Sequence, residues 1–162
     1  MYACMSKRLA WIQAAVLLGG TLFAWYTTVK NFVRFYHFEG TLFKIHNCVI
    51  PNPVTEPCFY GALAFLVALL WMVYIIRQNI VRHVRYVFWF LAAGTAFAWI
   101  NVTREVVAFY TARGTPVLGC SATPILNPFL TPCFTGASIF LLSLLLAAVQ
   151  YNHIMKQKMS VQ

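Results

Sequence analysis

Cysteines are the residues of this chain whose type and spacing point most directly to chemistry. The 162 residues include five cysteines, and four of them form two pairs: Cys48 with Cys58, and Cys120 with Cys133. In an oxidising compartment each pair can close a disulfide, and an accessible pair can also exchange electrons with a thiol partner. The fifth cysteine, Cys4, stands alone near the start of the sequence.

The second cysteine of each pair follows a proline at an expected helix start. Residues 131–133 read Thr-Pro-Cys, which gives a good N-cap residue, a proline at the first helical position and a cysteine just inside. Residues 56–58 read Glu-Pro-Cys, the same order with a poorer cap. Unpaired backbone N–H groups and the helix dipole favour a thiolate at such a position. We therefore expect Cys58 and Cys133 to be the more reactive cysteines, each resolved by the first member of its pair.

The same pairs also have a purely structural interpretation. Disulfides Cys48–Cys58 and Cys120–Cys133 would each staple a loop to the start of a helix, and closing a loop of this size stabilises by ~2–3 kcal/mol. Neither pair has the C-x-x-C spacing typical of redox catalysis. His46 lies beside the first pair, but the second pair has no histidine at the equivalent place, so no metal site is predicted.

Composition places these cysteines in a membrane protein. Hydrophobic residues make up 61% of the chain and charged residues only 9%, whereas a soluble domain carries about 25% charged residues. A spanning helix needs roughly 20 mostly apolar residues. Four segments meet this need, at residues 9–29, 59–76, 86–102 and 134–149. The expected fold is an all-α, integral membrane four-helix bundle that forms one membrane domain over residues 1–162.

The net charge of +9 is explained by the membrane, so no nucleic-acid partner is expected. Basic residues gather at the ends of the apolar segments, and the Lys/Arg bias predicts orientation. The denser basic side comprises Lys7, Arg8, Arg77, Arg82, Arg85, Lys156 and Lys158. This side should be cytoplasmic in a plasma or inner membrane, with both termini inside. Both long loops would then be extracytoplasmic, where cysteines oxidise.

The two halves of the sequence match at a spacing of 74 to 75 residues. Residues 20–25 read Gly-Thr-Leu-Phe-Ala-Trp and residues 94–99 read Gly-Thr-Ala-Phe-Ala-Trp, and the cysteine segments 57–62 and 132–137 match as well. Ordered matches of this kind predict two tandem helix–loop–helix repeats related by a pseudo-two-fold axis along the membrane normal. The repeats cover about 9–80 and 85–155.

Two glycines fall in the middle of predicted spans. Gly20 and Gly94 occupy equivalent places in the first and third segments. A glycine inside a helix costs stability unless a close contact uses it. We therefore expect the first and third helices to cross near these two residues.

Four helices, termini inside and a cysteine pair in each outer loop resemble the membrane disulfide-forming oxidoreductases of the DsbB and vitamin K epoxide reductase-like group. The resemblance covers the whole chain as architecture. It implies a quinone-linked thiol–disulfide oxidoreductase that acts on the extracytoplasmic side and takes electrons from a thiol protein. The C-x-x-C motif of that group is missing here, so the resemblance assigns no role to any individual residue.

Arg104 is the remaining candidate. It lies at the outer end of the third segment, where a charge is often functional, and a quinone headgroup contact or an ion pair with Glu105 would explain it. A second function remains open beside the enzyme. The chain would then be a non-catalytic accessory or scaffold subunit of a larger membrane complex, with two stapled loops as its docking surface and lipids around its helices.

Overall fold

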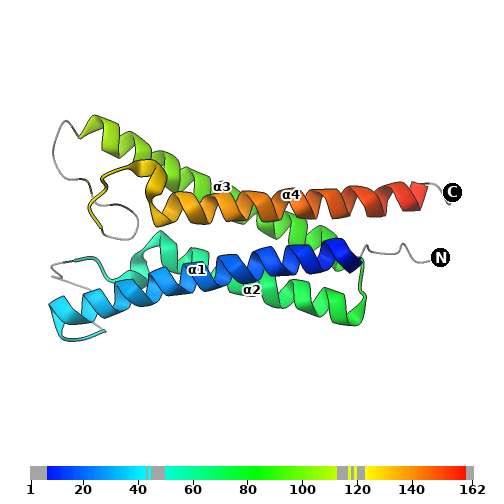
Figure 1. Cartoon of the computed structure of the whole chain (residues 1–162), viewed down its shortest axis with the longest axis horizontal. Helices are drawn as coiled ribbons and strands as arrows, with labels where there is room; N and C mark the ends of the chain where they lie inside the picture. Colours follow the sequence, from blue (N-terminus) through cyan, green and yellow to red (C-terminus); the bar gives the residue numbers. More distant parts are fainter. Residues whose placement is uncertain are drawn as a thin grey trace.

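Four long helices form nearly all of the described chain. The computed structural model describes residues 7–42, 44, 50–112, 117, 119 and 123–159. The elements in chain order are α1 (Lys7–Glu39), η1 (Pro53–Thr55), α2 (Pro57–Gln78), α3 (His83–Thr111), η2 (Pro128–Leu130) and α4 (Pro132–Met159), as Figure 1 shows. Each α-helix is long and apolar enough to cross a membrane. This confirms the prediction of an all-α fold with four candidate membrane spans.

The helices extend well beyond the apolar segments that predicted them. The first segment was expected to end near residue 29, yet α1 continues to Glu39. A hydropathy window ends where apolar residues thin out, whereas a helix ends where its backbone is capped. Gly40, with a φ of +68°, supplies that cap, and its N–H donates to the Tyr36 carbonyl at 2.9 Å. Asn79, with a φ of 53°, ends α2 in the same way.

The helices pack as two pairs that lie against each other. The most extensive contacts join α1 to α2 and α3 to α4, while α1 with α4 and α2 with α3 close the bundle (Figure 1). Small residues such as Ala10, Ala62 and Ala147 are fully or almost fully buried, which lets neighbouring backbones approach closely. The Gln150 side chain also donates a buried hydrogen bond to Gln13 Oε1 at 2.6 Å, which joins α4 to α1.

The two mid-helix glycines do not mark a crossing of α1 and α3, so that prediction was wrong. Within the described ranges α1 and α3 make no contact. Gly20 instead faces the Phe65 ring of α2, and Gly94 faces the Phe140 ring of α4. Each glycine leaves room for an aromatic ring from the following helix. The sequence alone does not distinguish this use of a glycine from a close crossing of two helix backbones.

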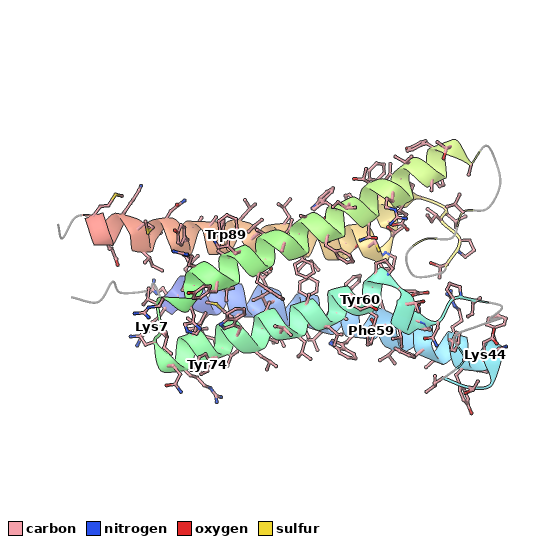
Figure 2. The ribbon with its side chains drawn as sticks, turned by 180° about the vertical axis from the view of Figure 1, so that it is seen from behind. Lys7, Lys44, Phe59, Tyr60, Tyr74 and Trp89 are labelled. Atoms are coloured by element: carbon pink, nitrogen blue, oxygen red, sulfur yellow. The ribbon has the colours of Figure 1, made fainter. Side chains whose placement is uncertain are left out.

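The charges divide between the two ends of the bundle. The start of α1, the end of α4 and the α2–α3 turn lie together at one end, and the loops lie at the other; Figure 2 shows Lys7 and Tyr74 at the first end and Lys44 at the second. The first end carries six of the seven predicted cytoplasmic cations: Lys7, Arg8, Arg77, Arg82, Arg85 and Lys156. The chain has only three acidic residues, and all of them lie toward the loop end: Glu39, Glu56 and Glu105.

Candidate functional site

Cys58 and Cys133 come together between the two helix pairs. Cys58 lies in the first turn of α2 and Cys133 in the first turn of α4. Their Sγ atoms are 3.5 Å apart. This separation exceeds the S–S bond length of about 2.05 Å, so the two sulfurs are in contact without being bonded to each other. The contact joins the two residues that the sequence singled out as the more reactive cysteines.

A repeated turn delivers each cysteine to this place. Asn52 precedes η1 and its side chain accepts from the Val54 N–H at 3.0 Å; Asn127 precedes η2 and accepts from the Phe129 N–H at 2.9 Å. Such asparagine side-chain bonds fix tight turns. In both halves one extended residue then follows, and a proline begins the next helix.

The caps of α2 and α4 behave as predicted. Thr131 Oγ1 accepts from the Phe134 N–H at 3.4 Å, which is the expected N-cap bond of α4. Glu56 makes no side-chain cap bond to α2, which agrees with its being the poorer cap. Its carboxylate is used for a different contact.

Each cysteine-bearing helix is latched to the preceding helix by one buried carboxylate. In the first half, Asn31 Nδ2 on α1 donates to Glu56 Oε2 at 3.1 Å. In the second half, Thr131 Oγ1 donates to Glu105 Oε2 on α3 at 3.2 Å. All four residues are buried. Asn31 and Glu105 are 74 positions apart, and Glu56 and Thr131 are 75 apart, so the two hydrogen bonds join equivalent positions of the two halves. In the first half the carboxylate belongs to the residue before the cysteine-bearing helix, and in the second half it belongs to the preceding helix.

A mostly apolar cavity of about 80 Å³ lies beside the two sulfurs. All four helices line it, chiefly through Phe23, Thr27, Cys58, Phe65, Gly94, Phe97, Cys133 and Phe140. The rings of Phe65 and Phe140 stack with their centroids 3.9 Å apart. A lining this apolar offers few hydrogen-bond partners, so the cavity suits an apolar group better than a cluster of waters, which would need several polar partners.

A surface groove between α2 and α3 adjoins the cavity. Tyr60, Phe97 and Asn101 line both spaces, and the groove continues to Arg104. Figure 2 shows Tyr60 near the loop end of α2, beside α3. The groove therefore lies at the junction of the two helix pairs and is open at the surface of the bundle.

Arg104 and Glu105 are neighbours in sequence but point in different directions. Arg104 is exposed and lines the groove, whereas Glu105 is buried and accepts the Thr131 hydrogen bond. The structure thus gives Glu105 a structural contact across the α3–α4 interface. Among the described residues that line the groove, Arg104 is the charged one.

Two carboxyl groups lie within electrostatic range of the Cys58 sulfur, those of Glu56 and Glu105. The surroundings of this cysteine are therefore less electropositive than its helix N-terminus alone suggested. Burial raises the pKa of Glu56 to about 7, against the opposing effects of the Arg34 charge and the Asn31 hydrogen bond. Glu56 is consequently a group that gains and loses a proton near neutral pH.

The other predicted site residues fall outside the described ranges. Cys48 and Cys120 lie there, as do Cys4 and His46, so the expected disulfides Cys48–Cys58 and Cys120–Cys133 stay predictions. Within the described residues, no three His, Cys, Asp or Glu side chains are grouped as a metal site would require.

Sequence reasoning missed the roles of Asn31, Glu56 and Glu105. One signal was present, because two of the three acidic residues, Glu56 and Glu105, lie only three positions from the predicted apolar segments 59–76 and 86–102. An acidic residue in such surroundings needs a hydrogen-bond partner. A residue-by-residue comparison of the two halves does not reveal this contact, because Asn31 aligns with Glu105 and Glu56 aligns with Thr131.

Comparison of the chain with known protein families, with curated proteins and with solved structures finds no match in any of the three.

Proposed function

We propose that this protein is a membrane thiol–disulfide oxidoreductase in which Cys58 and Cys133 exchange electrons beside a cavity for a quinone. The single observation that carries the proposal is the 3.5 Å contact between two sulfurs from opposite halves of the chain, at the edge of an apolar cavity. Structural staples within each loop require no such contact. A relay between two cysteine pairs does require it.

The chemistry at this contact is thiol–disulfide exchange. A thiolate attacks one sulfur of a disulfide, a new S–S bond forms, and the second sulfur leaves as a thiolate. Cys133 is disulfide-bonded, and the 3.5 Å distance means that its bonded partner is not Cys58. Once the Cys48–Cys58 pair is reduced, the Cys58 thiolate lies at van der Waals distance from a sulfur that it can attack.

The four cysteines divide into two communicating pairs in this proposal. Cys48 with Cys58 forms one pair and Cys120 with Cys133 the other, and the two helix-start cysteines pass electrons between them. The loop end then faces the extracytoplasmic side, where a thiol protein supplies the electrons. The matched turns and latches at spacings of 74 and 75 residues support a pseudo-two-fold relation between the halves.

The electron acceptor in this proposal is a quinone. Two thiols reduce a quinone to a quinol with transfer of two electrons and two protons, and the dithiol becomes a disulfide. The groove between α2 and α3 offers lateral entry from the membrane. The cavity lined by Phe65 and Phe97 accepts an apolar ring, and Arg104 donates hydrogen bonds to a ring oxygen at the groove.

A redox titration of the chain in lipid nanodiscs tests this function. Thiols are counted by alkylation and mass spectrometry across applied potentials, with and without a ubiquinone or menaquinone analogue. We expect at least one pair to titrate near about −200 mV or above and to be reoxidised by quinone. The variants Cys58→Ala and Cys133→Ala should lose quinone-dependent oxidation, while Cys4→Ala should retain it.

The opposite result identifies the alternative. If both pairs titrate below about −300 mV and ignore quinone, they are structural disulfides. The chain is then better described as an accessory subunit whose stapled loops dock a larger complex, and the oxidoreductase proposal is withdrawn.

A further inference from the structure

An aromatic cage surrounds His83 at the α2–α3 turn, which lies at the end of the bundle opposite the loops. The Trp71 indole Nε1 donates to His83 Nδ1 at 3.2 Å, which joins the two helices. The rings of Trp71, Tyr74 and Tyr86 form the cage, with centroids 6.3, 6.2 and 5.9 Å from the centroid of the imidazole. Figure 2 shows Tyr74 at the same end as Lys7. These contacts fix both the place and the direction of the imidazole.

The Trp71 hydrogen bond determines which imidazole nitrogen of His83 carries the proton. A ring nitrogen that accepts a hydrogen bond has no proton of its own, so in the neutral ring the proton is on Nε2. No described residue accepts a hydrogen bond from Nε2. Because His83 is only half-buried, a group from outside the chain can approach this donor.

Two exposed arginines flank the cage. Arg77 lies three positions after Tyr74, on the same face of α2. Arg82 is the N-cap residue of α3, has helical backbone angles and lies four positions before Tyr86, on the same face of that helix. The three acidic residues of the chain all lie toward the loop end, so no acidic side chain neutralises these two cations. The turn therefore presents two positive charges and one imidazole donor to a partner.

We propose that the α2–α3 turn binds the headgroup of an anionic phospholipid. Arg77 and Arg82 donate hydrogen bonds to the phosphate oxygens, and His83 Nε2 donates a third. The partner is a lipid rather than a soluble anion because exposed rings adjoin the cations: Tyr74 and Tyr86 are each 48% exposed. Such aromatic side chains lie at the level of the headgroups, where one end meets water and the other meets hydrocarbon. A ligand with a negative head and apolar chains matches both parts of this surface.

Arg85 provides a matched control in the first turn of α3. It is exposed and carries the same charge, but it lies two positions after His83 and therefore on a different face of the helix. Phe88, three positions further along, stacks on Tyr151 of α4 with ring centroids 5.7 Å apart, so this face of α3 lies toward α4. A general attraction of anionic lipid to basic residues would treat Arg82 and Arg85 alike. A headgroup site at the cage depends on Arg82 and not on Arg85.

Native mass spectrometry of the chain in mild detergent tests the site by counting the lipids bound to each chain. The probes are phosphatidylglycerol and phosphatidylcholine with identical acyl chains, titrated separately. We expect the first phosphatidylglycerol to bind the wild-type chain at least about 10-fold more tightly than phosphatidylcholine. Arg77→Gln and Arg82→Gln should each weaken this binding about 10-fold, as expected for loss of a hydrogen bond to a charged group. Neither variant should change phosphatidylcholine binding, and Arg85→Gln should leave the binding of both lipids unchanged.

His83→Asn tests the imidazole donor separately from the cage. Asparagine keeps a side-chain oxygen that can accept from Trp71, but its shorter side chain has no donor at the place of Nε2. The variant should therefore keep the Tm of the wild-type chain and bind phosphatidylglycerol more weakly, with phosphatidylcholine binding unchanged. Wild-type affinity for phosphatidylglycerol in this variant would remove His83 from the site and overturn the proposed set of donors.

Equal losses of phosphatidylglycerol affinity in Arg82→Gln and Arg85→Gln overturn the inference, because they indicate a general attraction to basic residues. Equal affinity of the wild-type chain for the two lipids overturns it as well. Glycerol 1-phosphate, a soluble counterpart of the headgroup, is added as a competitor at the same concentration as the lipid and should not displace bound phosphatidylglycerol. Displacement by this competitor would identify a site for soluble phosphates and reject the lipid. The assay involves neither thiols nor quinone, so its outcome is independent of the proposed oxidoreductase function.

Discussion

The Phe65 ring stacks on the Phe140 ring across the centre of the bundle, with the two planes 27° apart. Phe65 comes from α2 and Phe140 from α4, so the stack joins the two helix pairs, and both rings line the same cavity as the two cysteines. Each ring occupies space left by a glycine of the preceding helix, Gly20 for Phe65 and Gly94 for Phe140. The shape of the cavity thus depends on two residues without side chains.

Gly20→Ala should destabilise the chain. The new Cβ would lie 2.5 Å from Phe65 Cε1 and 3.0 Å from Ile139 Cγ2. The Phe65 ring cannot retreat without disturbing its stack on Phe140, so the cost should be about 1–3 kcal/mol. Thermal unfolding in mild detergent, followed by tryptophan fluorescence, measures it as a lower Tm.

Gly19→Ala is the control for this substitution. It lies one position earlier in α1, where an added Cβ meets nothing within 4 Å. Alanine is favoured over glycine inside a helix by roughly 0.5–1 kcal/mol, so Gly19→Ala should leave Tm unchanged or raise it. Equal Tm values for the two variants would show that the packing of the Phe65 ring does not require a glycine at position 20.

The sequence was sufficient to predict the number of helices, their approximate places and the two helix-start cysteines. Hydropathy predicted the helices, and the proline before each cysteine predicted where two of them begin. Both signals depend only on residues that are close together in the sequence. The glycines were identified as packing positions but given the wrong partner. A missing side chain indicates close approach without saying which neighbour approaches, and that depends on how α2 and α4 are rotated.

The Cys58–Cys133 contact could not be derived from spacing. The pairs within each loop are close in sequence, so a pairing argument favours them, while a contact between residues 75 positions apart depends on how the two helix pairs meet. The buried latch was hidden for a different reason. Glu56 and Glu105 occupy non-equivalent places in the two halves, and only the structure shows that Glu56 accepts a hydrogen bond from Asn31 and Glu105 one from Thr131.

Thr131→Val tests the latch of the second half. The substitution removes the hydroxyl that donates to Glu105 and caps the Phe134 N–H, while keeping side-chain size and shape. Removing one hydrogen bond to a charged buried group costs about 1–3 kcal/mol, and the lost cap adds to this. Chemical unfolding in detergent should therefore show a clear loss of stability. Thr103→Val on the exposed face of α3 should change stability by less than about 0.5 kcal/mol.

A chain that retains only Cys58 and Cys133 should form an internal disulfide under mild oxidation. Their sulfurs already lie 3.5 Å apart, so a small side-chain rotation brings them to bonding distance. Diamide treatment in nanodiscs followed by non-reducing peptide mass spectrometry should find the linked peptides at high yield. A matched chain with Cys58→Ser and Tyr60→Cys moves the thiol two positions along α2. It should give little linkage, and equal yields in both chains would mean that the contact is not specific.

Stability should fall as pH rises toward neutrality, because of Glu56. Its folded-state pKa of about 7 lies above the usual value of 4.5. Between these two pH values the folded chain holds a proton that the unfolded chain has released, so protons favour folding there. The contribution is complete below about pH 4.5 and is lost as pH passes 7. Tm measured between pH 5 and 8 should show this decline, and Glu56→Gln should flatten it, whereas Glu39→Gln should leave it in place.

Arg104 should affect quinone affinity more than turnover. It is exposed at the polar end of the groove that adjoins the cavity, away from the latch that fixes its neighbour Glu105. Arg104→Ala should therefore fold normally and raise the KM for a quinone analogue about 10-fold, as expected for loss of one charged hydrogen bond, with little change in kcat. Arg85→Ala, at the opposite end of α3, should leave both constants unchanged. A fall in kcat at constant KM would instead place Arg104 in the electron-transfer step, and equal behaviour of the two variants would remove it from the quinone site.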